Sequence, residues 1–115
     1  YAVARFNDQV AFVYTNDYTY NMKISGFDWD SGNWPKCGKH GVSREEIEQV
    51  LLGEPAVMPD PCPDEPRMRA IGKTNAGRYV FLVFMMREID GWIKLRPISA
   101  RYMHKKEISH YESQI

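Results

Sequence analysis

Residues 67–102, RMRAIGKTNAGRYVFLVFMMREIDGWIKLRPISARY, form the stretch of sequence that decides the fold. Three segments within it, 67–74, 78–88 and 92–100, are rich in the β-branched, aromatic and aliphatic residues that are typical of strands. Asn75, Ala76 and Gly77 are typical of a hairpin loop between the first two segments, and Asp90 with Gly91 is a hairpin turn sequence. The sequence therefore predicts an antiparallel meander.

A helix is predicted shortly before this stretch, over the residues that follow Ser43. Ser43 is a suitable N-cap, Glu46 three residues later completes a capping box, and apolar residues at helical spacing extend to Leu51. Gly53 and Pro55 are typical of the end of a helix.

Two further helices are expected on either side of these elements. One is expected to begin at Asp30 or Ser31 and to run irregularly toward Lys39, because glycines and a proline lie inside it. A short C-terminal helix is expected over roughly 103–112, with His104 on its N-cap side. The predicted fold class is α+β, with N-terminal helices, a twisted antiparallel sheet and a C-terminal helix.

The charges are divided between the two halves of the chain. The segment MPDPCPDEP, residues 58–66, is predicted to be a loop because its four prolines have no backbone N–H to donate. The net charge is −6 over residues 27–66 and +8 over residues 67–106, although the whole chain is neutral. The basic half can offer a phosphate-binding surface, or its charges can simply be the solvated outward face of a sheet.

The N-terminal segment is interpreted separately. The sequence begins with Tyr1 and its first methionine is Met22, so residues 1–21 are predicted to be an appended or upstream-translated segment and residues 22–115 a single domain. The alternating pattern QVAFVYT at residues 9–15 could equally form an edge strand.

Length and composition restrict the class of protein. A chain of 115 residues can bury a core without metals or disulfides, and its longest apolar run is too short to span a bilayer. The first residues lack the pattern of a secretory signal, so a cytosolic location is expected, with Cys37 and Cys62 as free thiols.

Several chemistries are disfavoured by missing motifs. The sequence contains no glycine-rich phosphate loop, no nucleophile elbow and no HExxH motif, so nucleotide hydrolysis, serine hydrolysis and zincin proteolysis are not first choices. Cys37 and His40 have a C-x-x-H spacing, but nothing else in the sequence suggests the four converging ligands of a zinc site. No metal or other cofactor is expected.

Phosphate chemistry without a metal ion remains. RNA carries its own nucleophile, the 2′-hydroxyl, so its cleavage needs a base, an acid for the leaving 5′-oxygen and cations that stabilise the phosphorane. The segment KCGKHG supplies Lys36, Lys39 and His40 for these tasks, and RPISAR supplies Arg96 and Arg101.

Each of these residues also has a purely structural interpretation. His40, followed by a glycine, can simply occupy the end of a helix. Glu107 can be a capping residue with His104 or an ion-pair partner of Arg101. Trp29 and Trp34 can stack on bases or pack against the core.

Two long motifs in the sequence resemble those of a known family. The first is FDWDSGNWPKCGKHGV, in which the matching residues are Phe27, Trp29, Asp30, Asn33, Lys36, Lys39, His40, Gly41 and Val42. In the second motif the matching residues are Arg67, Arg96, Ser99, Ala100, Arg101, Glu107 and Tyr111. Through these motifs, nearly all of residues 24–112 resemble the BrnT family of bacterial type II toxins.

The resemblance implies a RelE-like α+β fold and a ribonuclease that slows growth by cutting RNA. It also implies a neutralising antitoxin of the ribbon-helix-helix type, similar to BrnA. Such antitoxins bind DNA, so the two proteins together are expected to repress their own operon, and the toxin reaches DNA only through its antitoxin. The antitoxin is expected to cover the basic face, where it would block RNA.

Each candidate residue has a predicted role in RNA cleavage or RNA binding. Arg67, Arg96 and Arg101 are predicted to bind and neutralise the scissile phosphate. His40 and Lys39 are candidate proton-transfer groups, and Glu107 is predicted to orient Arg101 or the substrate. Further RNA-binding residues are expected to be the basic residues Lys36, Arg78, Lys94, Lys105 and Lys106.

A competing hypothesis is a binding module without catalysis. Such a protein would keep the fold and the antitoxin surface, act as a co-repressor in a DNA-bound complex, and have little or no nuclease activity.

Overall fold

The fold is taken from a computed structural model, which describes residues 10–15, 18–53, 55–60 and 66–114 of the chain. Its elements in chain order are β1 (Val10–Thr15), β2 (Tyr18–Phe27), the 3-10 helix η1 (Lys36–Gly38), α1 (Arg44–Leu52), β3 (Ala56–Pro59), β4 (Arg67–Lys73), β5 (Tyr79–Ile89), β6 (Trp92–Tyr102) and α2 (Lys105–Glu112).

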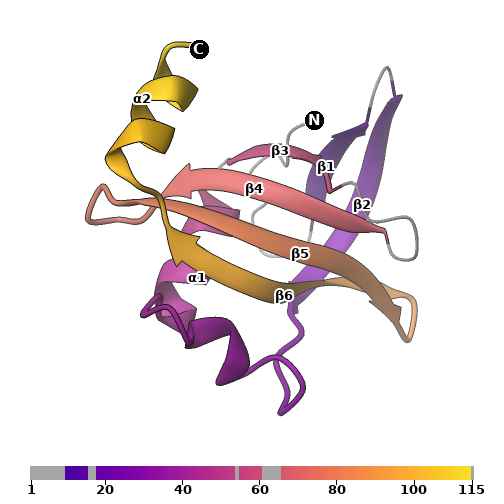
Figure 1. The fold of residues 1–115 in the computed structure, drawn as a ribbon. Coiled ribbons are helices and arrows are strands. Elements are labelled where there is room, and N and C mark those ends of the chain that lie inside the picture. Colours follow the sequence, from indigo (N-terminus) through magenta and orange to yellow (C-terminus); the bar gives the residue numbers. More distant parts are fainter. Residues whose placement is uncertain (1–9, 16–17, 54, 61–65, 115) are drawn as a thin grey trace.

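The strands form one sheet in the order β1-β2-β6-β5-β4-β3 (Figure 1). The predicted meander is confirmed, because β4 pairs antiparallel with β5 and β5 pairs antiparallel with β6. The prediction of an entirely antiparallel sheet is wrong, since β2 runs parallel to β6 through the pairs Ile24–Ile93 and Phe27–Leu95. The domain is therefore α+β with a mixed sheet.

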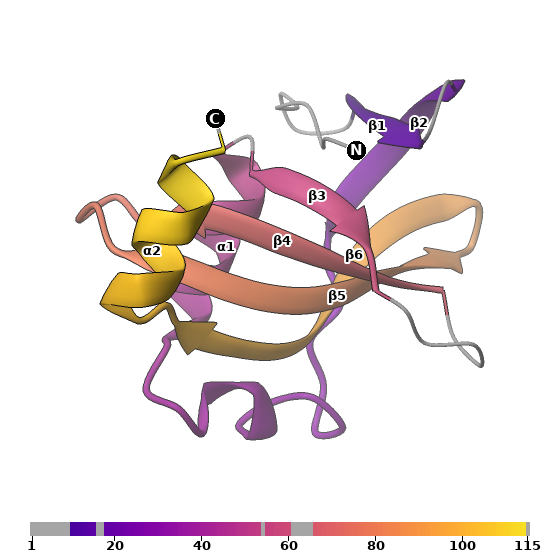
Figure 2. The same ribbon diagram turned by 45° about the horizontal axis from the view of Figure 1, so that its top comes forward.

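The two α-helices lie on opposite faces of the sheet, with α2 in front and α1 behind it in Figure 2. We call the face under α1 the inner face and the face under α2 the outer face. The core lies on the inner face, where Ile47, Val50 and Leu51 of α1 are buried together with Leu82 and Phe84 of β5. Burial of these apolar side chains is the main stabilising contribution.

The capping box predicted for α1 is present. The Ser43 hydroxyl accepts a hydrogen bond from the Glu46 N–H at 3.1 Å, and the Glu46 carboxylate accepts one from the Ser43 N–H at 3.1 Å. These bonds satisfy two of the donors that a helix N-terminus leaves unpaired. Gly53 is the C-cap, as the sequence indicated.

The prediction of a helix between Asp30 and Lys39 is wrong. Residues 31–35 form turns, and only Lys36–Gly38 is helical, as a short 3-10 segment. Pro35 has no N–H for an α-helical bond, and a side chain at Gly38 would meet the Trp34 ring, with only 2.5 Å between the two. Strands β1 and β2 also precede α1, so the predicted N-terminal helices do not open the fold.

The loop predicted over residues 58–66 begins later than expected. Met58 and Pro59 belong to β3, which pairs with Arg69 and Met68 of β4 at the edge of the sheet. An edge strand tolerates proline because its outward N–H has no ladder partner to lose. Residues 61–65, which include Cys62, lie outside the described residues; Cys37 is a free, buried cysteine.

The alternative interpretation of residues 9–15 as an edge strand is confirmed by β1, which pairs with β2. The predicted boundary between residues 21 and 22 falls inside β2, and residues 1–9 lie outside the described residues. None of the helices in the described part of the chain has the length and apolar character needed to span a membrane.

A β-bulge in β6 decides which side chains share the outer face. Phe84 pairs with Pro97 and Val83 pairs with Ser99, so Ile98 is an additional residue on β6. Strict alternation would place Arg96 and Arg101, five positions apart, on opposite faces of the sheet. Because of the bulge, Arg96 pairs with Met85 and Arg101 pairs with Phe81 on the same outer face.

Candidate functional site

The segment that carries the first motif follows the edge of β6. After Phe27 the chain leaves the sheet, and the Asp28 N–H donates to the Leu95 carbonyl at 2.8 Å. Further along β6, the Tyr102 hydroxyl lies 3.3 Å from the Gly41 carbonyl. Residues 28–41 are therefore held along β6 from Leu95 to Tyr102.

Asn33 is the buried polar residue that fastens this segment. Its side-chain N–H groups donate to the carbonyls of Asp28 and Pro97, each at 2.9 Å. Its side-chain oxygen accepts a hydrogen bond from the Asp30 N–H at 2.8 Å. Only 3% of Asn33 is exposed, so this amide is fully engaged inside the chain.

Arg96 is held by two carboxylates of the same segment. Its two terminal nitrogens lie 3.0 Å from the two oxygens of Asp30, and one of them also lies 3.2 Å from Asp28. The hydrogen bonds from Arg96 hold the pKa of Asp30 below its usual value. Only 16% of the Arg96 side chain is exposed, so Arg96 connects the segment to the outer face of β6.

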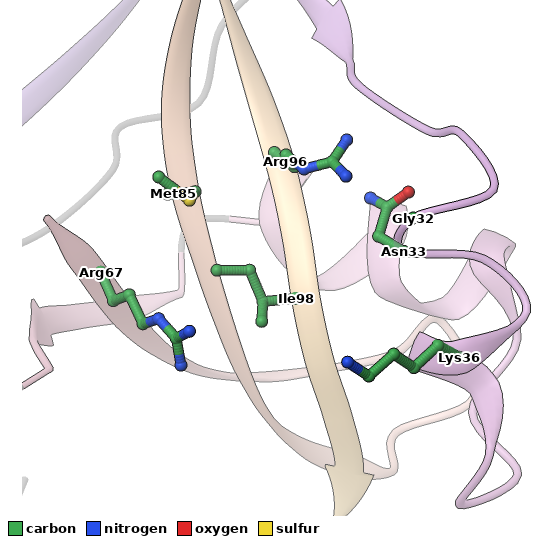
Figure 3. Close-up of a pocket in the computed structure, with 7 residues that line it drawn as sticks. All are labelled: Gly32, Asn33, Lys36, Arg67, Met85, Arg96 and Ile98. Atoms are coloured by element: carbon green, nitrogen blue, oxygen red, sulfur yellow. The ribbon is translucent and has the colours of Figure 1, made fainter. Parts of the chain in front are cut away.

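The first pocket lies between this segment and the outer face, and we call it the lysine pocket (Figure 3). Its volume is about 250 Å³, and it is lined by Gly32, Asn33, Lys36, Arg67, Met85, Arg96 and Ile98. Figure 3 shows the Lys36 and Arg67 side chains extending from opposite sides toward the space over Ile98.

Arg101 forms a bidentate ion pair with Glu107 at the start of α2. Both nitrogen–oxygen distances are 2.8 Å, and Glu107 also accepts a hydrogen bond from the His104 N–H at 2.9 Å. The hydrogen bonds from Arg101 and His104 lower the pKa of Glu107 to about 2. Glu107 is therefore ionised at neutral pH and cannot supply a proton there.

The second pocket lies at the end of β6, and we call it the histidine pocket. Its volume is about 520 Å³, and it is lined by His40, Arg78, Arg101, Tyr102, Met103 and His104. The Arg78 guanidinium lies over the Tyr102 ring at 3.4 Å from its centroid, and the Tyr102 hydroxyl lies 2.7 Å from the Glu46 carboxylate. His40, Arg78 and His104 are exposed, so a ligand can reach them.

The structure thus divides the predicted site residues between two pockets. Lys36, Arg67 and Arg96 line the lysine pocket, whereas His40, Arg78 and Arg101 line the histidine pocket. Glu107 contacts Arg101 directly. The remaining predicted residues line neither pocket: Lys39, Lys94, Lys105 and Lys106.

Sequence reasoning missed the pocket role of His104 and the ion pairs of Asp28. His104 stands in the basic stretch before α2, but it was interpreted only as a capping residue. A signal for it existed, because the resemblance places Arg101 and Glu107 on either side of it. Asp28 had no such signal, since its partner Arg96 is 68 positions away.

Trp29 and Trp34 pack against the protein rather than extend into solvent. Trp29 and Trp34 lie against the core with their ring centroids 5.5 Å apart, and the Trp29 N–H donates to Glu48 at 2.9 Å. The Arg44 guanidinium lies 5.5 Å from the Trp34 centroid. Of the two interpretations of these residues, the structure supports packing.

The described residues contain no group of three or more His, Cys, Asp or Glu side chains that could hold a metal ion. Burial raises the pKa of the Cys37 thiol to about 11. Cys37 is therefore a thiol at neutral pH, and the C-x-x-H spacing with His40 does not present the thiolate that binds a metal.

The fold and the two pockets define a small α+β protein whose sheet face is suited to phosphate groups. Residues 29–107 match the model of the family described as "Ribonuclease toxin, BrnT, of type II toxin-antitoxin system", and the chain therefore belongs to this family. A search of curated proteins gave no match. The resemblance inferred from the two motifs is confirmed, and membership implies an RNA target and an antitoxin partner.

Proposed function

We propose that this chain is a metal-independent endoribonuclease that cuts RNA through attack of the 2′-hydroxyl on the adjacent phosphate. The observation that carries the proposal is the histidine pocket. It combines two exposed imidazoles, His40 and His104, with two guanidinium groups, Arg78 and Arg101.

These groups match the needs of the reaction. A base takes the proton of the 2′-hydroxyl, and the 2′-oxygen forms a bond to phosphorus. The bond from phosphorus to the 5′-oxygen breaks, and an acid protonates that oxygen as it leaves. The products are a 2′,3′-cyclic phosphate and a 5′-hydroxyl, and the nucleophile is the substrate's own.

We assign the proton transfers to His40 and His104, one acting as base and the other as acid. Arg78 and Arg101 would stabilise the negative charge that develops on the phosphate. Glu107 acts as a positioning residue, because its bidentate pair fixes the orientation of Arg101. Lys39, the other proton-transfer candidate, is exposed next to His40 but does not line the pocket.

The remaining basic residues are proposed to bind RNA outside the reaction centre. Lys105 and Lys106 are exposed at the start of α2, just beyond His104. Lys94 lies on β6 two residues before Arg96, and Arg67 and Lys36 face each other across the lysine pocket. Arg96 itself is proposed to hold the motif segment rather than the scissile phosphate.

The family setting extends the proposal to a partner. We propose a RelE-like toxin that acts in the cytoplasm, inhibits translation and growth, and is neutralised by a ribbon-helix-helix antitoxin similar to BrnA. An antitoxin that covers the basic outer face would block RNA and offset positive charge. The toxin would contact DNA only through that antitoxin.

One observation favours the second candidate, a non-catalytic binding module that acts with its antitoxin as co-repressor. Arg96 and Arg101 are both paired with carboxylates of the chain itself. A phosphate would have to compete with these carboxylates for the same donors. In a binding module the two arginines would be purely structural.

An RNA cleavage assay in EDTA separates the two candidates. The purified chain is incubated with single-stranded RNA beside His40→Ala, His104→Ala and His110→Ala variants, and product ends are identified by mass. We expect 2′,3′-cyclic ends, and a rate reduced by about 10²- to 10⁴-fold in the first two variants.

His110→Ala is the matched control, because His110 is an exposed histidine on α2 that does not line the histidine pocket. Equal rates in all variants would show that the histidine pocket takes no part in the reaction. If the chain binds RNA but none is cut, the binding module becomes the better description.

A further inference from the structure

We infer that the lysine pocket is a second RNA subsite, which holds a phosphodiester and its unpaired base several nucleotides away from the scissile bond. This inference rests on the proposed ribonuclease function. It assigns to the pocket a ligand class, single-stranded RNA, and a role in binding rather than in proton transfer.

The charges of the pocket favour an anion. Arg96 is paired with Asp30 and Asp28, and the side-chain amide of Asn33 is engaged by backbone groups, so these two residues form the wall. Lys36 adds positive charge from one side of the pocket, and the Arg67 side chain lines the opposite side (Figure 3). Lys36 is exposed at the start of η1, where its flexible side chain can follow a phosphate.

The floor of the pocket favours a base. Met85 and Ile98 line it with apolar side chains, and Ile98 follows Arg96 by two positions on the outer side of β6. A β-carbon at position 32 would lie 3.0 Å from side-chain atoms of Arg96 and Asp30. The glycine therefore leaves this edge of the pocket open. The pocket volume of about 250 Å³ is smaller than the ~300–1,000 Å³ usual for ligand pockets. We therefore assign it a single nucleotide.

The distance between the pockets sets the length of RNA that can use both. Arg96 and Arg101 pair with Met85 and Phe81, which are four residues apart on β5, so the two arginines are separated by about 13 Å at ~3.3 Å per residue. A stacked strand advances about 3.4 Å per nucleotide along its axis, so roughly four nucleotides or fewer bridge the gap. A dinucleotide cannot occupy both pockets, whereas a longer single strand can. Base-paired RNA would keep its bases stacked and out of the pocket.

The first test measures binding without cleavage. A 2′-O-methyl single-stranded oligonucleotide lacks the nucleophile, and its affinity is measured by fluorescence anisotropy over a series of salt concentrations. Lys36→Ala should weaken binding about fivefold at low salt, as expected for one exposed charge pair. It should also reduce the slope of log K against log salt by about 0.7, the value for one phosphate contact on a single strand.

Lys73→Ala is the matched control. Lys73 is an exposed lysine at the other end of the outer face, where its ammonium lies 5.0 Å from the Tyr79 ring centroid. It lines neither the lysine pocket nor the histidine pocket, so its removal should leave the salt slope unchanged. Lys36→Glu should weaken binding more than Lys36→Ala, and thermal unfolding verifies that each variant folds.

The second test compares substrates. Lys36→Ala should slow cleavage of a long single-stranded RNA more than cleavage of dinucleoside monophosphates, because only the long RNA reaches the lysine pocket. Equal slowing of both substrates, or of neither, would overturn the subsite. A changed salt slope in a chain that cuts no RNA would support the subsite and refute the nuclease. An unchanged slope combined with weaker antitoxin binding would assign the pocket to the antitoxin instead.

Discussion

Arg96 and Arg101 have the same side chain and stand on the same strand, but their surroundings differ. Arg96 has 16% of its side chain exposed and is shared by two carboxylates, while Arg101 has 39% exposed and is paired with one. A guanidinium that is nearly buried between two carboxylates has few donors left for a substrate. The difference supports the proposal that Arg96 has a structural role and that Arg101 is the arginine that binds the substrate.

Removing Arg96 should therefore destabilise the protein. Arg96→Ala removes the nearly buried guanidinium that pairs with both Asp28 and Asp30, and leaves Asp28, whose side chain is only 14% exposed, with the more exposed Arg87. We expect the free energy of unfolding to fall by about 1–3 kcal/mol, as for loss of a hydrogen bond to a charged group. Urea unfolding at neutral pH measures the change.

Arg87→Ala is the control for this prediction. Arg87 contacts the same Asp28 oxygen at 2.9 Å, but 47% of its side chain is exposed. Its removal should change the free energy of unfolding by no more than about 0.5 kcal/mol. Similar losses in both variants would mean that Arg96 has no special structural role.

At the scale of single residues, the sequence was informative where the partners are close along the chain. Ser43 with Glu46, and Arg101 with Glu107, are separated by three and six positions, and both contacts were anticipated. The pairing of Arg96 with Asp30 was not, because 66 residues separate them and each residue alone is compatible with many partners.

Among the elements, β6 illustrates the limit of periodicity. Alternation agrees with the burial of Leu95 and Pro97 and with the outward position of Arg96, but it cannot show the bulge at Ile98. No glycine marks this bulge, so the return of Arg101 to the outer face could not be predicted from residue types alone. The helix predicted over residues 30–39 does not form. The prediction relied on the capping signal at Asp30 or Ser31 and gave too little weight to Gly32, Pro35 and Gly38, which disfavour a helix.

Helix α2 provides a prediction about pH. None of its residues is buried, and it is attached to the sheet by the Arg101–Glu107 pair and by the hydrogen bond from Tyr79 to Glu112, at 2.8 Å. The pKa of Glu107 is lowered from 4.5 to about 2. Because the folded-state pKa is the lower one, this pair stabilises the fold above pH 4.5, and the contribution is lost as the pH falls from 4.5 toward 2.

Comparing the wild type with Glu107→Gln over this range measures the contribution. The wild type should unfold at higher urea concentration at neutral pH, and the difference between the two should shrink as the pH falls below 4.5. A difference that stays constant through this range would show that ionisation of Glu107 does not attach α2.

For the whole molecule, the position of the domain boundary remains a prediction. Where burial is described, from residue 26 onward, the buried side chains lie between Asn33 and Ala100. Strand β1 pairs with β2, whereas the contacts of β2 with β6 begin at Ile24. A chain of residues 22–115 should therefore fold, with a thermal midpoint close to that of the longer chain.

Thermal unfolding of both forms tests this boundary, and intact mass of the protein made from its own gene tests whether residues 1–21 are native to it. A truncated chain that aggregates or melts without cooperativity would place the first strands inside the domain.

The overall class was predictable because it depends on local patterns. Hairpin turns, a capping box and strand composition are all short-range signals, and they were enough for the meander, α1 and the α+β class. The parallel pairing of β2 with β6 joins distant segments, and no local signal encodes it.

The hydrogen bond from Asn33 to Pro97 has a consequence for the order in which the protein is made. It joins positions 64 residues apart, so the segment that carries Lys36 and His40 cannot be fastened to β6 until that strand has been synthesised. Nearly the entire chain must therefore emerge from the ribosome before the two pockets exist. The proposed nuclease would therefore lack both pockets, and with them its activity, while most of its chain is still being synthesised on the RNA-rich ribosome.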